Sequence, residues 1–144
     1  MDEGMHWRSG VRVVRDTSLR RAQSAPGAGG RATVFDFTGA GGRATWIGRV
    51  VLPAGASTGP HHHGRHEVAL AVLEGQVEIR WGAQLEFLAD AGPGDAVYFA
   101  PGVPHQERNP SAARDVSYLV VRSDHERIVV PLPIEVAAAP QRVE

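Results

Sequence analysis

Short apolar segments alternate with glycine- and proline-rich stretches along the chain, and most of these segments are rich in valine and isoleucine. Runs of this length between turn-forming residues are typical of β-strands. No segment has the 3.6-residue periodicity of a long amphipathic helix. The pattern predicts strands at Val11–Val14, Arg31–Phe37, Thr45–Leu52, Glu67–Leu73, Gln76–Trp81, Ala96–Phe99, Val116–Val121 and Ile128–Pro131.

The segments between the predicted strands read as turns. Several short strands at this spacing favour an all-β sandwich or barrel. We expect Asp16–Gln23 to form a helical turn and the tail Ala137–Glu144 to fray. The predicted turns are Ser24–Gly30, Gly39–Gly42, Glu74–Gly75 and Ala91–Asp95.

Composition excludes several kinds of chemistry. The 144 residues are enough for one domain with a substantial core. A formal net charge of −1 offers no basic surface for nucleic acid or an anionic membrane. The absence of cysteine excludes disulfides, thiolate catalysis and cysteine-bound zinc. All 15 residues in the Lys+Arg total are arginine, which excludes a Schiff base on a lysine side chain.

Targeting segments are not evident in the sequence. No apolar run approaches the roughly 20 residues of a membrane span. The first residues, MDEGMHWRSG, lack the charged-then-apolar pattern of a signal peptide. We therefore expect a cytoplasmic protein that binds neither membranes nor nucleic acid.

The histidines are concentrated in one place. Four of the seven fall within six residues, His61 to His66, directly before a predicted strand. Side chains at positions i and i+2 of a strand face the same way, so His61 and His63 share a face and His62 points away. A further histidine, His105, follows two prolines in APGVPHQERN. Because imidazole binds divalent zinc, iron, manganese, nickel and copper, the pattern indicates a metal site.

These residues resemble the two sequence motifs of cupins. The first motif is Gly-x5-His-x-His-x3–4-Glu-x6-Gly, and its residues here are Gly55, His61, His63, Glu67 and Gly75. Seven residues rather than six separate the last two. The second motif is Gly-x5-Pro-x-Gly-x2-His-x3-Asn, and its residues here are Gly94, Gly102, His105 and Asn109. In this second motif the proline is shifted by one place, to Pro101, and Ala100 stands where proline is usual.

The resemblance implies a fold and a cofactor. Cupins are jelly-roll barrels, also described as double-stranded β-helices. Residues 1–144 would form a single cupin domain, with N-terminal strands at about 8–50, the motifs at 55–109 and C-terminal strands at 116–134. One divalent metal ion per chain is implied, and we expect zinc, with iron(II), manganese or nickel as alternatives. Asn109 would have a structural role in a turn.

The additional residue before Gly75 leaves the fourth metal ligand open. Counting back from Gly75, the inward positions are Val72, Leu70 and Val68, and His66 is in phase with them. Glu67 is out of phase, because a shift of one residue moves a side chain to the other face. We therefore expect the metal ligands to be His61, His63, His66 and His105. A β-bulge would instead turn Glu67 inward as the ligand; otherwise Glu67 is the candidate catalytic acid or base.

Three classes of function are compatible with these motifs. The chain resembles small bacterial cupins of the resistomycin-cyclase type, which implies an aldol-type cyclisation and aromatisation of a poly-β-ketone, with the metal as Lewis acid. A second class is a dioxygenase that uses a redox metal on a diketone or aromatic substrate. A third is a non-catalytic cupin that binds a small molecule. Each class implies an apolar, metal-chelating small molecule as the partner.

The resemblance also implies an oligomer. N-terminal strands of small cupins commonly extend the sheet of a neighbouring subunit, which covers a sheet edge. Residues Val11–Phe37 are the candidates for this pairing. We therefore expect a homodimer.

Overall fold

The computed structural model describes residues 7–8, 10–15, 20–23, 30–35, 37, 42–124 and 128–143. This part of the chain is built from strands. They are β1 (Arg20–Gln23), β2 (Arg31–Phe35), β3 (Trp46–Leu52), β4 (His61–His62), β5 (Val68–Glu74), β6 (Val77–Trp81), β7 (Phe87–Ala91), β8 (Ala96–Phe99), β9 (His105–Arg108), β10 (Val116–Arg122), β11 (Val130–Pro131) and β12 (Gln141–Arg142). Among the described residues, no helix has the length and hydropathy needed to cross a membrane.

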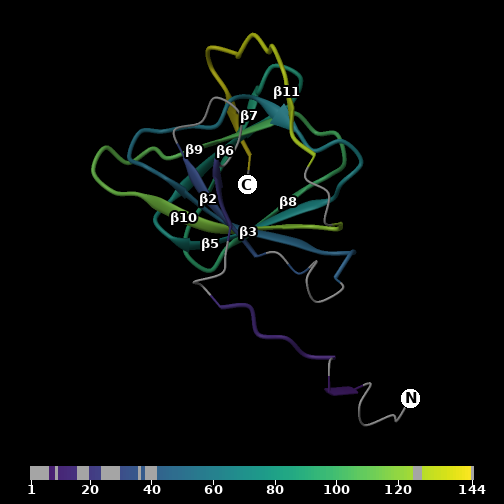
Figure 1. The fold of residues 1–144 in the computed structure, drawn as a ribbon. Helices are drawn as coiled ribbons and strands as arrows, with labels where there is room; N and C mark the ends of the chain where they lie inside the picture. Colours follow the sequence, from purple (N-terminus) through teal and green to yellow (C-terminus); the bar gives the residue numbers. More distant parts are fainter. Residues whose placement is uncertain are drawn as a thin grey trace.

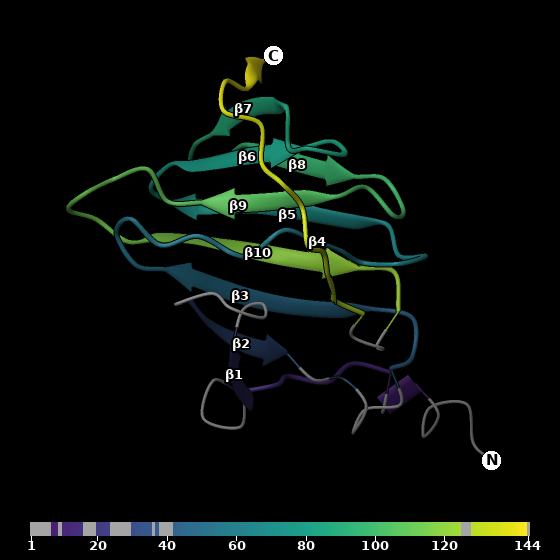
Figure 2. The same cartoon turned by 90° about the horizontal axis from the view of Figure 1, so that it is seen from above.

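The strands form two six-stranded sheets. Figures 1 and 2 show their arrangement from two directions. One sheet has the order β1-β2-β3-β10-β5-β8, and the other has the order β11-β4-β9-β6-β7-β12. The pairing is antiparallel except between β12 and β7. The expected all-β jelly-roll fold is therefore confirmed.

The core lies between the sheets and follows from side-chain alternation. Strands β3 and β10 both alternate strictly between buried and half-buried positions, as expected when every second side chain points inward. They pair along their whole length, from Leu52 opposite Val116 to Trp46 opposite Arg122. Both Leu52 and Val116 are fully buried. The apolar residues at every second position of these strands therefore lie together in one apolar core.

Most predicted strands are found within a few residues of their expected bounds, and Ala96–Phe99 is found without change. The prediction at Val11–Val14 is wrong. In the described part of the chain this segment joins no strand, and Val11 and Val13 are exposed. Figure 1 shows it running away from the two sheets. Alternating apolar residues do not form a strand where no neighbouring strand pairs with them.

Two other expectations are corrected. Arg20–Gln23, expected within a helical turn, forms β1 and pairs with β2, while residues 16–19 lie outside the described part of the chain. The tail, expected to fray, contains β12, which pairs in parallel with β7. Backbone N–H groups of Gln141 and Val143 donate to the carbonyls of Glu86 and Leu88. These hydrogen bonds need no apolar side chains, so hydrophobic patterning does not reveal them.

Strand β5 provides a test of the core. Leu70 is 1% exposed and faces the interior, whereas Leu73 is 44% exposed. We expect Leu70→Ala to lower the free energy of unfolding by about 2–5 kcal/mol, because it removes buried methyl groups and leaves a cavity. Leu73→Ala is the matched control and should change it by less than about 1 kcal/mol. Denaturant titration measures both, and equal effects would contradict the assigned facing of β5.

Candidate metal centre

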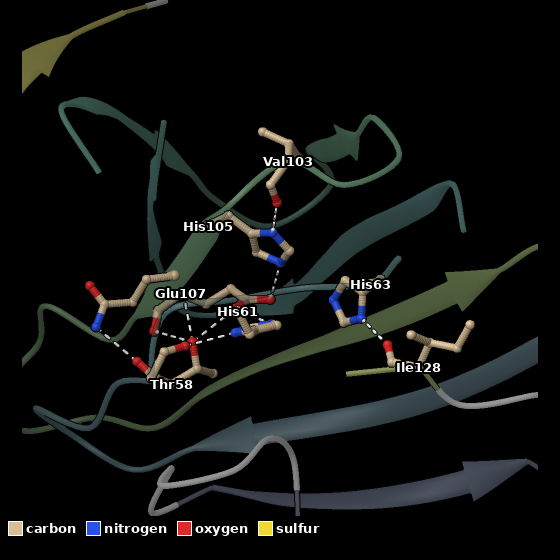
Figure 3. Close-up of polar contacts among 9 residues, drawn as sticks. Thr58, His61, His63, Val103, His105, Glu107 and Ile128 are labelled. Carbon is tan, nitrogen blue, oxygen red and sulfur yellow. Dashed lines mark hydrogen bonds and ion pairs between the residues drawn. The ribbon is translucent and has the colours of Figure 1, made fainter. Parts of the chain in front are cut away.

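Three histidines from separate parts of the chain meet inside the barrel. Cross-strand pairing of β4 with β9 sets His61 opposite His105, and His63 follows directly after β4. All three side chains are buried, and one ligand atom from each lies within 4.8 Å of those of the other two. Figure 3 shows the three rings grouped between the sheets. All three belong to the expected ligand set, which also included His66.

Backbone carbonyls set the orientation of all three rings. The Nδ1 atoms of His61, His63 and His105 lie 2.7, 2.8 and 3.0 Å from the carbonyl oxygens of Gly59, Ile128 and Val103. A carbonyl only accepts hydrogen bonds, so each Nδ1 carries the hydrogen. The lone pair of each imidazole is then on Nε2. Metal-binding histidines are commonly oriented by this kind of contact.

The three residues fit a divalent metal ion. Nε2 of His105 is fully buried and has no hydrogen-bond partner among the described residues. A buried polar atom without a partner costs free energy, and coordination to a metal would remove that cost. Nitrogen donors from three histidines form a common ligand set for zinc and for other divalent transition metals.

Burial keeps two of these imidazoles neutral. Desolvation, followed by the charges of His105, Arg122 and His61, lowers the pKa of His63 from its ordinary 6.5 to about 3. Desolvation also lowers the pKa of His105. Only neutral imidazole coordinates a metal, so these two ligands are ready to bind without first losing a proton.

A buried carboxylate, Glu107, lies beside the three histidines. Its Oε2 is 3.7 Å from Nε2 of His61, and its Oε1 is 3.9 Å from Nε2 of His105. Sequence reasoning missed this residue because HQER is polar and was not predicted as a strand. It nevertheless forms β9, and Glu107, two residues after His105, faces the same way. The two-residue spacing between His105 and Glu107 is therefore the feature of the sequence that could have identified Glu107 as part of the site.

The structure does not bring His66 and Glu67 into the group of three. His66 is buried, as the phase of β5 predicted, and its Nε2 lies 3.3 Å from Oδ2 of Asp124. Glu67 is exposed and accepts a hydrogen bond of 2.7 Å from the hydroxyl of Tyr98. The roles expected for these two residues stay predictions.

Two further residues behave as the motifs suggest. Nδ1 of His62 accepts a hydrogen bond from the backbone N–H of Gly64, so this ring is engaged in the local turn. The side-chain amide of Asn109 is buried and donates to the carbonyls of Leu52 and Arg114. Asn109 therefore has the structural role expected for it, since it ties the loop after β9 to the end of β3.

A small cavity adjoins the histidines. Its volume is about 20 Å³, which is room for about one water molecule. Arg122 is buried there, with its guanidinium 3.9 Å from the centre of the Trp46 ring, a cation–π contact. The side chains lining the cavity include His61, His63, Glu107, Tyr118, Trp46 and Arg122.

A larger, mainly apolar cavity of about 300 Å³ lies on the side of β6, β7 and β8. Phe99 lines it and also stacks on His105, with the two ring centres 4.1 Å apart. One aromatic ring therefore connects this cavity to the histidine group. Other residues that line it include Ile79, Trp81, Val97 and Val103.

The family model of the cupin domain matches residues 48–122, which is more than half of the chain. The chain is a cupin. The matched region contains both motifs and all three clustered histidines of this cupin. No curated protein matches it in sequence.

Solved structures resemble this cupin in fold. The polyketide cyclase RemF from Streptomyces resistomycificus has a TM-score of 0.72 at 23% identity, over 90% of this chain and 89% of that one. A cupin-superfamily sugar phosphate isomerase from Silicibacter pomeroyi has a TM-score of 0.62 at 23% identity, over 78% and 75%. Oxalate decarboxylase from Bacillus subtilis has a TM-score of 0.66 at 19% identity, but only 33% of its chain is covered. These neighbours are enzymes of different reaction classes that share one fold.

The lowered pKa of His63 predicts how the metal-free protein responds to acid. Unfolded His63 binds a proton near pH 6.5, whereas the folded residue does so only near pH 3. Between these values the unfolded state holds the extra proton, so stability should fall as the pH is lowered, by about 1.4 kcal/mol per pH unit for one full proton. We expect His63→Gln to reduce this slope in chelator-treated protein, measured by denaturant titration at several pH values. An unchanged slope would contradict the burial of a neutral His63.

Proposed function

We propose that this cupin is a metal-dependent enzyme that cyclises and aromatises a poly-β-ketone. The observation that carries the proposal is the group of three buried imidazoles, each fixed through Nδ1 so that its Nε2 lone pair is available. Similarity to a polyketide cyclase over nine-tenths of both chains supports the choice of reaction. Oxalate decarboxylase from Bacillus subtilis aligns over only a third of its own length, whereas a predicted oxalate decarboxylase from Thermotoga maritima aligns over all of it.

The proposed reaction needs no oxidant. A carbon between two carbonyl groups loses a proton and attacks a carbonyl carbon of the same molecule, which forms the new carbon–carbon bond. The carbonyl oxygen takes up a proton, and loss of water then leads to the aromatic ring. A divalent ion held by His61, His63 and His105, which we propose to be zinc, would supply a Lewis acid for the carbonyl oxygens.

Two side chains of the small cavity are suited to stabilise negative charge on a substrate oxygen. Arg122 lines it together with His61 and His63 and keeps its positive charge at any physiological pH. Tyr118 lines it too, and desolvation, with the charge of Glu107, raises the pKa of its hydroxyl well above the ordinary value. The hydroxyl therefore stays protonated and can donate a hydrogen bond. Fixed donors in a buried site are effective in this role.

The apolar cavity is the proposed place for the bulk of the substrate. The small cavity has room for little more than one oxygen atom with its hydrogens, so the carbon chain must lie elsewhere. The larger cavity, at about 300 Å³, is at the lower end of known ligand pockets. Phe99, between this cavity and His105, would exclude water from the reacting carbons.

We also propose that the protein is a single-domain, cytoplasmic homodimer. Trp7, Val11 and Val13 are exposed near the N-terminus, and pairing of this segment with the sheet of a second copy would cover them. Light scattering coupled to size-exclusion chromatography tests this assembly directly, and a monomer would reject it.

Metal content and oxygen dependence distinguish this reaction from the alternatives. We expect about one zinc per chain by elemental analysis. A poly-β-ketone supplied by a reconstituted polyketide synthase should be cyclised equally well with and without oxygen. Iron, manganese or nickel with oxygen uptake would favour a dioxygenase instead. Metal binding without turnover of any such substrate would favour a binding protein.

The proposed donor role of Tyr118 predicts a selective loss of activity. Tyr118→Phe removes only a hydroxyl from a buried ring, and we expect kcat to fall about ten- to a hundredfold while zinc content is unchanged. Ser117→Ala is the matched control, since it removes a hydroxyl from the neighbouring position of β10, which is half-buried and faces away from the interior. Full activity of Tyr118→Phe would remove Tyr118 from the reaction.

A further inference from the structure

The first motif contains one carboxylate, Glu67, which is the alternative fourth ligand of the metal. In this chain the residue after it, Val68, is the one that points into the barrel. Val68 is 3% exposed and pairs with Phe99, whereas Glu67 faces solvent. A valine side chain has no donor atom. The histidine group therefore receives no carboxylate from the first motif in this structure.

The second motif supplies a carboxylate in its place. Glu107 lies on β9, and its two carboxylate oxygens are 3.7 and 3.9 Å from Nε2 of His61 and of His105. Metal–ligand bonds of about 2.0–2.2 Å place two ligand atoms roughly 3–3.5 Å apart. The separations at Glu107 are close to this range. Figure 3 shows its carboxylate directed toward the two rings.

The carboxylate of Glu107 is buried with fewer hydrogen bonds than it can accept. The residue is 6% exposed, and its carboxylate accepts one hydrogen bond among the described residues, 3.0 Å from Oγ1 of Thr58. A carboxylate has about four acceptor positions, so one neutral hydroxyl leaves most of its capacity unused. The carboxylate can therefore accept a further partner on the side that faces His61 and His105.

Thr58 also fixes where the carboxylate can go. Its Oγ1 accepts a hydrogen bond of 3.0 Å from the backbone N–H of Glu107 while donating to Oε2 of the same residue. The backbone N–H of Thr58 in turn donates to the carbonyl of Glu107. Three contacts with one residue hold Glu107 in its present orientation, beside two of the three candidate ligands.

We propose that Glu107 is the carboxylate ligand of the metal centre, which makes the ligand set His61, His63, His105 and Glu107. This inference rests on the proposed function, because it names a ligand of the same site. The carboxylate offsets one positive charge of a divalent ion, and it contributes the oxygen donor of a three-histidine, one-carboxylate set. Neither His66 nor Glu67 is needed to complete four ligands.

Zinc affinity measures this assignment without reference to catalysis. Glu107→Gln keeps the shape of the side chain but removes its charge. We expect this variant to bind zinc at least about tenfold more weakly in competition with a chromophoric chelator. Glu78→Gln is the matched control, because Glu78 is paired with Arg108 on the same sheet and should retain wild-type affinity. His66→Gln and Glu67→Gln, at the two alternative positions, should also retain it.

A second measurement examines the metal site of the wild-type protein. X-ray absorption at the zinc edge of the wild-type protein should fit three imidazoles and a carboxylate oxygen, and circular dichroism checks that Glu107→Gln is folded. A shell of four imidazoles, or wild-type zinc affinity in folded Glu107→Gln, would overturn the proposal. Each result differs from a failure of the proposed function, in which zinc binds through Glu107 but no poly-β-ketone is cyclised.

Discussion

The antiparallel pairing of β4 with β9 places His61 directly opposite His105, and the candidate metal centre depends on this cross-strand contact. These two short strands carry few apolar side chains of their own. Backbone carbonyls at Gly59, Val103 and Ile128 then set the rotation of each imidazole through Nδ1. The orientation of the three imidazole rings is therefore set mainly by contacts with the backbone. The packed sheets hold that backbone in place.

Electrostatic balance around the histidines follows from the same burial. Desolvation keeps His63 and His105 neutral, while Arg122, stacked on Trp46, adds a fixed positive charge nearby. A divalent ion would add further positive charge, so a negative partner is needed inside the barrel. Glu107 is the buried carboxylate that lies against these rings. Hydrogen bonds with Thr58 hold this charged group in its position.

The cupin fold alone does not decide the reaction, since its structural neighbours include a cyclase, a decarboxylase and an isomerase. The features that bear on the reaction of this chain are the cavities near its histidines. One cavity of about 20 Å³ adjoins the histidines and contains charged and hydroxyl groups. Another of about 300 Å³ is mainly apolar and is separated from His105 by Phe99. A small polar cavity and a larger apolar cavity therefore lie on either side of the contact between Phe99 and the histidine group.

Sequence alone was sufficient for the all-β fold, because period-two alternation is a local property. The two cupin motifs placed His61, His63 and His105 in one group, but the phase of β5 placed His66 in it as well. The same phase also predicted the burial of His66. Tertiary structure was needed for Glu107, since the polar segment HQER becomes a strand only through pairing with β4 and β6. The pairing of β12 with β7 likewise relies on backbone hydrogen bonds between distant segments. Which carboxylate faces the histidines was decided by the register and packing of strands far apart in the chain, and a one-dimensional pattern does not contain that information.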